Sequence, residues 1–346
     1  MRIGLDAYTV ERRGLTAEQT LDFAAERDLE GVQFLTPSAL DPDLDPGRLR
    51  KVRALADARG LALEVGIPSL NPARRSRIEG RTVSPAEHAA DLIRQVEGVA
   101  TLGCHHARVY LGDRHDRFRD DSPWADQLRS SREVLERLVP ALRRLCVALA
   151  IETHADVTVV ELFVFLDAIP PEILGVTLDT GNLLMRLDDP AGAVERLAPR
   201  VLATHVKDAV LAFTPRGLCW QARPVGSGIL PMTDLLATLH RANPALMLLI
   251  ELHPRTYDPP IFDPAWLAHF PDLTPSSLAA VVKLAVSSER RFAEGSLARP
   301  EVIEAIPWAD RELDWLASLA GYLRAVVQML GRDDETRAGR GVLSHG

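Results

Sequence analysis

The sequence contains few cysteines, few lysines and no long apolar run. The only cysteines in 346 residues are Cys104, Cys146 and Cys219, and they form no CxxC pair. This excludes a disulfide scaffold and a zinc ribbon, and it fits a reducing compartment. No window holds 18 consecutive apolar residues, and the first residues lack a basic stretch followed by an apolar one. We therefore expect a cytoplasmic protein with no membrane partner.

Basic residues are outnumbered and strongly biased towards arginine. The 40 Lys and Arg residues face 48 Asp and Glu, which gives a formal net charge of −8. This charge disfavours a nucleic-acid partner, because such proteins neutralise phosphates with basic side chains. Lysine stands only at positions 51, 207 and 283, so a lysine near a predicted site is a candidate for a specific role. The 47% hydrophobic content is sufficient for a sizeable core.

Short apolar runs with strand character alternate with longer segments of helical periodicity. Eight such units of roughly 30 residues are typical of a (β/α)8 TIM barrel. A doubly wound sheet is the alternative, but no glycine-rich phosphate turn follows the first strand. The expected strands cover residues 2–6, 31–35, 61–66, 106–111, 147–152, 174–179, 201–206 and 246–251.

The barrel prediction also defines the parts of the chain. We expect the barrel over residues 1–290, a C-terminal helical extension over 291–330, and no regular structure over 331–346. The extension is expected to pack on the barrel or on a second copy of the chain. Long connections rich in Pro, Gly and charge follow several strands, where TIM barrels build their active sites. They cover residues 67–85, 112–131, 207–231 and 252–276.

Four polar residues share one position at the ends of the last four expected strands. They are Glu152, Asp179, His205 and Glu251, and strand parity turns all four towards the barrel interior. A single carboxylate or histidine at a strand end is more often structural, but four successive coincidences favour a shared metal site. Three carboxylates and one imidazole suit Mn²⁺, Mg²⁺ or Co²⁺ better than structural Zn²⁺.

Around these residues the sequence resembles the xylose isomerase-like TIM barrels, the sugar phosphate isomerase/epimerase superfamily. The resemblance covers about residues 1–290 and is most specific in IETH, LDTGN, HVKD, VGSG and IELH, at 151–154, 178–182, 205–208, 225–228 and 250–253. It implies one divalent metal held by the four residues. It also implies that Glu152 and Glu251 act as acid and base while the metal stabilises an enediolate.

Further residues are expected to bind a small-molecule sugar, sugar acid or sugar phosphate. The arginine-rich connections 67–85 and 112–131 favour an anionic substrate, because guanidinium groups pair with carboxylates and phosphates. Lys207 stands out because lysine is rare in this chain. The candidates that follow or precede the motifs are His154, Asn182, Lys207, Arg108, Arg223, His253 and Arg255.

Departures from the family pattern keep more than one activity open. Endonuclease IV-like members need extra histidines, whose places are taken here by Asn182 and the segment DAVLAFTPRG. The ketohexose epimerases carry an arginine six residues after the seventh-strand histidine, where this chain has Leu211. An isomerase or epimerase is the first hypothesis. A lyase, either a decarboxylase of a 3-oxo sugar acid or a dehydratase, is the second, and a non-catalytic sugar-binding barrel is the third.

Overall fold

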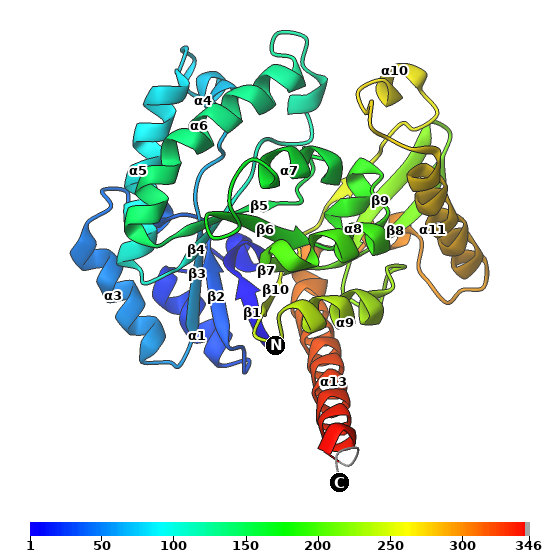
Figure 1. Cartoon of the computed structure of the whole chain (residues 1–346). Coiled ribbons are helices and arrows are strands. Elements are labelled where there is room, and N and C mark those ends of the chain that lie inside the picture. Colours follow the sequence, from blue (N-terminus) through cyan, green and yellow to red (C-terminus); the bar gives the residue numbers. More distant parts are fainter. Residues whose placement is uncertain (343–346) are drawn as a thin grey trace.

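Eight parallel strands close into a barrel in the computed structural model, which describes residues 1–342 (Figure 1). Their order around the barrel is β1-β10-β7-β6-β5-β4-β3-β2. Every strand agrees with its expected range to within two residues at either end, so the (β/α)8 prediction is confirmed. The strands are β1 (Arg2–Asp6), β2 (Gly31–Phe34), β3 (Ala62–Gly66), β4 (His106–Val109), β5 (Ala148–Glu152), β6 (Leu174–Asp179), β7 (Val201–Val206) and β10 (Met247–Ile250).

The inside of the barrel is packed with side chains rather than open. Met247 and Leu249 of β10 point towards Gly4 of β1, where an added Cβ would lie 2.9 Å from Leu249 Cδ2. A Cβ at Gly31 of β2 would lie 2.7 Å from Met247 Cε. The two glycines therefore make room for large side chains of β10, as the packed layers of a barrel require.

Helices cover the barrel, and many begin at a capping side chain followed by proline. Proline suits the first helical turn, and the side chain before it accepts an otherwise unpaired backbone N–H. Such pairs are Thr36–Pro37, Asp45–Pro46, Asn71–Pro72, Ser84–Pro85, Asp189–Pro190, Asp263–Pro264 and Thr274–Pro275. Helices that follow the barrel strands are α1 (Ala17–Ala25), α3 (Pro46–Asp57), α5 (Pro85–Thr101), α6 (Trp124–Leu145), α7 (Val159–Leu166), α8 (Pro190–Leu197) and α9 (Met232–Ala242).

The long last helix, α13 (Trp308–Val342), takes the place of the eighth barrel helix. It contacts β1, β10 and α9, and its Leu319 and Leu323 are fully buried. Its Arg324 Nη2 donates to the carbonyl oxygen of Arg27, 2.7 Å away, just after α1. The helix therefore covers the gap between α9 and α1, although the sequence analysis places it in an extension beyond the barrel.

The C-terminal border also differs from the expectation. We expected no regular structure over 331–346, but α13 continues to Val342, and residues 343–346 lie outside the described part. Once the buried part of a helix is formed, each added residue costs little, and no proline interrupts this segment. The border expected at residue 290 falls inside α11 (Pro275–Ala293). None of the described helices is both long and apolar enough to cross a membrane.

A small antiparallel sheet stands beside the barrel, where the sequence analysis expected loops (Figure 1). Its strands are β8 (Asp208–Thr214), β9 (Gly217–Arg223) and β11 (Thr256–Tyr257), and α11 packs on β8. Pro215 and Arg216 connect a hairpin within the expected loop 207–231. The missed signal is the apolar run of β8, which the neighbouring proline and glycine residues outweighed.

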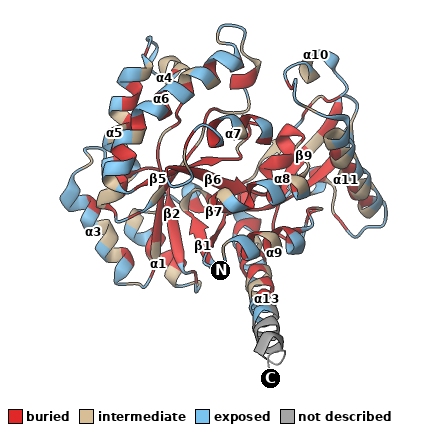
Figure 2. Ribbon diagram, in the orientation of Figure 1, coloured by how far each residue is buried: buried red, intermediate tan, exposed pale blue. Residues whose placement is uncertain are grey.

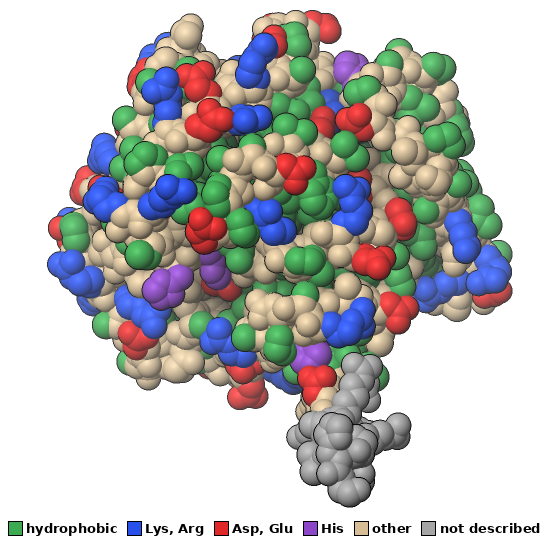
Figure 3. All heavy atoms as spheres, in the orientation of Figure 1, with side chains coloured by type: hydrophobic (Ala, Val, Ile, Leu, Met, Phe, Trp, Pro, Cys, Tyr) green, Lys and Arg blue, Asp and Glu red, His purple; other side chains and the backbone are tan. Residues whose placement is uncertain are grey.

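Short elements occupy the remaining connections. They are η1 (Ala7–Arg13), α2 (Pro37–Leu40), α4 (Pro72–Glu79), η2 (Asp116–Phe118), η3 (Asn182–Arg186), η4 (Ala198–Arg200), α10 (Pro264–Leu267) and α12 (Pro300–Glu304). Burial follows the barrel: the strands are buried, while the outer faces of the helices are exposed (Figure 2). On the face shown in Figure 3, acidic and basic side chains are intermixed, so the negative net charge forms no single field there.

Candidate functional site

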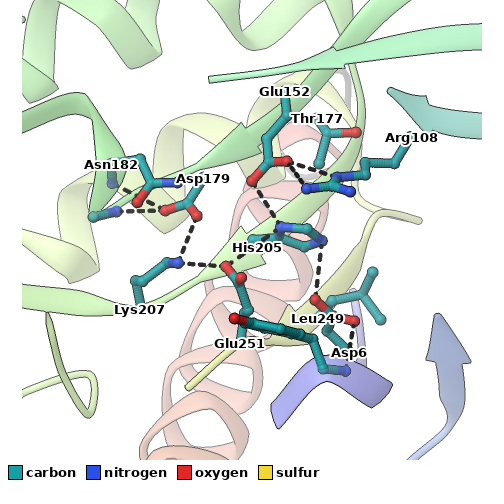
Figure 4. A network of polar contacts seen from close by, with 12 residues as sticks. Asp6, Arg108, Glu152, Thr177, Asp179, Asn182, His205, Lys207, Leu249 and Glu251 are labelled. Atoms are coloured by element: carbon teal, nitrogen blue, oxygen red, sulfur yellow. Dashed lines mark hydrogen bonds and ion pairs between the residues drawn. The ribbon is translucent and has the colours of Figure 1, made fainter. Parts of the chain in front are cut away.

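Four candidate metal ligands meet at the mouth of the barrel. Glu152 ends β5, Asp179 ends β6, His205 is the penultimate residue of β7, and Glu251 directly follows β10. These strands are neighbours in the barrel, so their inward side chains converge (Figure 4). One ligand atom from each residue lies within 4.8 Å of the others, and all four side chains are buried. The arrangement suits a divalent cation with oxygen and imidazole ligands.

The orientation of the His205 ring is set by a residue from the other side of the barrel. Gln33 on β2 donates through Nε2 to Glu64 Oε2, 3.2 Å away, so its amide oxygen faces His205. That oxygen accepts a hydrogen bond from His205 Nε2 at 2.7 Å. The lone pair of the neutral ring therefore lies on Nδ1, which is 3.2 Å from Glu152 Oε1. Such a second contact is how metal-binding histidines are held in position.

Two cationic side chains, the partly buried Arg108 and the buried Lys207, pair with the carboxylates of the set. Arg108 Nε lies 2.6 Å from Glu152 Oε2. Lys207 Nζ lies 2.8 Å from Asp179 Oδ2 and forms a second, short ion pair with Glu251 (Figure 4). Lys207 is fully buried, so the lysine singled out by its rarity is held by two candidate metal ligands. Its ammonium group offsets part of the negative charge of the cluster.

The protonation of the site shows how strongly negative the cluster is. Burial opposes the charge on His205, but the carboxylates of Glu251 and Glu152 outweigh burial and raise the pKa of the imidazole to about 9. Burial and the same two carboxylates raise the pKa of Asp179 to about 7, although Lys207 acts in the opposite direction. Protons therefore neutralise charge here, and a divalent cation is suited to replace them.

Glu152 stays ionised in spite of its burial. Burial by itself would raise the pKa of its carboxyl group, but Arg108 and His205 hold that pKa well below its ordinary value. Asp179 is placed differently: its Oδ1 accepts the backbone N–H groups of Gly181 and Asn182, each at 3.0 Å. Its Oδ2 faces the cluster, where the Lys207 ammonium group lies 2.8 Å from it. An ionised Glu152 and an Asp179 oxygen that faces the cluster fit a metal-binding role.

Three side chains of the motif HVKD have different structural roles. His205 and Lys207 face the cluster, while Asp208 holds the VGSG loop against the barrel. The Asp208 carboxylate accepts backbone N–H groups from Ala209, Gly226, Gly228 and Leu230 at 2.8–3.1 Å. A Cβ at Gly228 would lie 2.2 Å from Asp208 Oδ1, so only glycine permits this approach. The two motifs form one structural unit beside the site.

A cavity of about 490 Å³ opens above the cluster. Glu251 lies at its base, and its wall combines cationic, aromatic and polar side chains from both halves of the barrel. The lining residues are Asp6, Tyr8, Gln33, Leu35, Arg74, Arg108, Tyr110, Asp113, Arg114, His115, His154, Ala155, Glu251 and Arg255. A cavity of this volume and polarity matches a small polyhydroxy compound.

The expected substrate contacts divide into three groups. Arg108, His154 and Arg255 line the cavity. Lys207 and His253 lie deeper, next to Glu251, with Lys207 Nζ 3.4 Å from His253 Nε2. The remaining two candidates do not line the cavity.

Asn182 lies buried beside Asp179, to which its backbone N–H is bonded. Arg223 ends β9, is only 3% exposed, and donates through Nη2 to the carbonyl oxygen of Ala298 at 2.8 Å. Its placement in the side sheet, rather than in a loop over the mouth, separates it from the cavity. For Arg223 the structure therefore provides a packing role between β9 and the segment before α12.

The sequence analysis missed several cavity residues. Asp6 ends β1 with the same inward parity as the four candidate ligands, and its Oδ2 lies 3.6 Å from His205 Nε2. Gln33 has that parity on β2, so the rule that identified the ligands was available for both. Tyr8 and Tyr110 follow β1 and β4, and no spacing in the sequence distinguishes them from other aromatic residues.

The comparisons with known proteins agree with this architecture. The model of the xylose isomerase-like TIM barrel family matches residues 21–269. A 3-oxo-isoapionate decarboxylase from Pectobacterium atrosepticum is 26% identical over 252 residues, which cover 69% of this chain and 81% of that protein.

Solved structures show the same fold at low sequence identity. A D-tagatose 3-epimerase-like protein superposes with a TM-score of 0.57 at 15% identity, covering 83% of this chain and 99% of that one. The 3-keto-D-glucoside 4-epimerase from Escherichia coli superposes with a TM-score of 0.54 at 16% identity, covering 82% and 99%. On the family match, which spans most of the barrel, the chain belongs to the xylose isomerase-like TIM barrel family.

Proposed function

We propose that the protein is a divalent-metal-dependent isomerase or epimerase of a small sugar or sugar acid. The observation that carries the proposal is the convergence of Glu152, Asp179, His205 and Glu251 within 4.8 Å, beside a cavity that Glu251 lines. When bound there, a divalent cation polarises a substrate carbonyl and its neighbouring hydroxyl and stabilises the negative charge that develops on them.

The residues of the chain supply the proton transfers. Glu152 is held ionised by Arg108, which suits it to remove a proton from the carbon beside the carbonyl. Glu251 lies across the cluster, and Lys207 keeps it in position through a short ion pair. In an epimerisation the other glutamate returns a proton to the same carbon on the opposite face. In an isomerisation the glutamate that removed the proton can return it to the neighbouring carbon. His154, 3.1 Å through Nδ1 from the Gly112 carbonyl oxygen, is placed to contact a substrate oxygen.

A decarboxylase of a 3-oxo sugar acid is the second candidate. It is favoured by the relative from Pectobacterium atrosepticum, a 3-oxo-isoapionate decarboxylase whose length is covered to 81%. Both reactions pass through an enolate next to a polarised carbonyl, so the same cluster serves either. In a decarboxylation the chain needs only one proton donor, because carbon dioxide leaves where a proton would otherwise be removed.

Metal content and isotope exchange test the proposal together. Purified protein is expected to retain about one divalent metal per chain, and Glu152→Gln is expected to weaken its metal affinity in a chelator titration. The loaded enzyme is then incubated with ketoses and with 3-oxo acids in D₂O. Deuterium beside an intact carbonyl identifies an isomerase or epimerase, and release of carbon dioxide identifies a decarboxylase. A protein without metal whose affinity is unchanged by Glu152→Gln contradicts both functions.

A further inference from the structure

The cavity above the cluster holds four arginines, and they differ in how their charge is compensated. Arg74 forms ion pairs with Asp113 and with Asp116, the latter at 3.2 Å. Arg108 is paired with Glu152. Arg114 and Arg255 form no ion pair with any carboxylate of the described residues, although both line the cavity. Two guanidinium charges are therefore left for a ligand.

The other arginines of the two arginine-rich connections have carboxylate partners. Arg75 and Arg81 pair with Glu79, Arg77 pairs with Asp116, Arg117 with Glu161, and Arg119 with Asp121. Arg114 lies among these paired arginines in the same connection but has no carboxylate partner in the described part of the chain. Arg114 and Arg255 are only half-buried, and both are held towards the cavity by uncharged groups.

Neutral contacts hold both guanidinium groups at the cavity. Arg114 Nη1 donates to the carbonyl oxygen of Thr256, 3.4 Å away, which is the residue after Arg255. Arg114 Nε lies 3.1 Å from His115 Nε2. Arg255 Nη2 lies 3.4 Å from the hydroxyl oxygen of Tyr8. None of these partners carries a negative charge that cancels the guanidinium charge, so an anion gains strongly from binding between them.

A buried arginine holds the two supporting segments together. Arg186 Nη1 lies 3.1 Å from the hydroxyl oxygen of Tyr257, and its Nη2 lies 3.4 Å from the carbonyl oxygen of Arg114. Its guanidinium carbon packs 5.7 Å from the ring centre of Phe118 and 5.8 Å from that of Phe270. The loop that carries Arg114 and the segment that carries Arg255 are thus joined from behind, away from the cavity.

We propose that Arg114 and Arg255 form a binding site for an anionic group of the substrate, a carboxylate or a phosphate. This inference rests on the proposed function, because it takes the reacting end of the substrate to lie at the cluster. The two arginines then bind the opposite end of the same molecule. Glu251, Arg114 and Arg255 line the same cavity, so one small molecule in it can contact both the cluster and the two arginines. The substrate class is then a sugar acid or a sugar phosphate, and a neutral sugar binds more weakly.

Binding of three ligands with the same carbon skeleton tests the site. The metal-loaded full-length protein is titrated by calorimetry with erythritol, erythronate and erythritol 4-phosphate. At least one anion is expected to bind about 10- to 100-fold more tightly than erythritol, which corresponds to charge-assisted contacts in a partly desolvated site. Tighter binding of erythronate assigns a carboxylate, and tighter binding of the phosphate ester assigns a phosphate.

Variants connect the preference to the two residues. Arg114→Gln and Arg255→Gln are each expected to reduce anion affinity about tenfold and to leave erythritol binding unchanged. Arg119→Gln is the matched control, since Arg119 lies in the same connection but is paired with Asp121. Equal affinity for all three ligands, no binding of either anion at millimolar concentration, or equal losses in all three variants overturns the proposal. Metal content measured on the same samples tests the proposed function separately.

Discussion

The two arcs of the barrel mouth carry polar side chains at equivalent positions but use them differently. On β5, β6, β7 and after β10 these side chains form the candidate metal-ligand set. On β1 to β4 they are Asp6, Gln33, Glu64 and Arg108, and they contact the set or each other. Inward parity therefore identifies which residues reach the mouth. The contacts that each of these side chains makes distinguish the candidate metal ligands from the residues that hold those ligands in place.

The largest difference between the arcs is expected from glutamate substitutions. Glu152→Gln removes both a metal ligand and an ionised base, so we expect the rate of deuterium exchange to fall by about 10³-fold or more. Glu64→Gln is the matched change in the other arc, where the carboxylate only contacts Gln33 and His106. It is expected to lower the rate less than about tenfold. Equal losses in the two variants would remove the distinction between the arcs.

Lys207→Met tests the charge balance of the ligand arc. The ammonium group lies between Asp179 and Glu251, and its removal leaves two buried carboxylates without that partner. We expect the free energy of unfolding of the metal-free protein to fall by about 3 kcal/mol, because breaking a buried ion pair leaves an uncompensated charge. Denaturant unfolding with chelator and with Mn²⁺ measures this loss. Bound metal is expected to reduce it, and an identical loss in both conditions argues against a shared charge balance.

Gln33→Leu tests the support given by the opposite arc. Without the amide oxygen, His205 Nε2 loses its 2.7 Å hydrogen bond and the ring is free to turn. Metal affinity is expected to fall about 10- to 100-fold, as it does when such supporting contacts are removed elsewhere. Competition with a fluorescent chelator measures the affinity. Gln33→Glu retains an oxygen acceptor and is expected to restore most of it; unchanged affinity in Gln33→Leu would show that Gln33 does not orient the ligand.

The last prediction concerns pH and the metal-free protein. His205 has a pKa raised from the ordinary 6.5 to about 9, so the folded chain keeps a proton that the unfolded chain releases. This contribution to stability is complete below pH 6.5 and is lost as pH rises to 9. Melting temperatures in chelator are therefore expected to fall over that interval. In His205→Asn the decline is expected to be shallower, and an equal decline in both proteins would contradict the assignment to His205.

The strands and the ligand set were predictable because both depend on local pattern. The eight strand ranges follow from apolar runs, and the four candidate ligands follow from parity at strand ends. The capping pairs such as Ser84–Pro85 are likewise local signals that mark where helices begin. The eighth barrel helix was placed in an extension, because more than 50 residues of inserted structure separate α13 from β10.

The sequence by itself determined the barrel and the residues that converge at its mouth, since parity and periodicity link close neighbours in the chain. Only the tertiary structure decided which charges are compensated. Gln33 reaches His205 across 172 positions and Arg108 meets Glu152 across 44, whereas Arg114 pairs with no carboxylate in the described part of the chain, although several lie near it in sequence. Such pairings depend on distances in space, which no local pattern encodes. They distinguish the arginines that hold loops in place through ion pairs from those whose charge is available to a ligand.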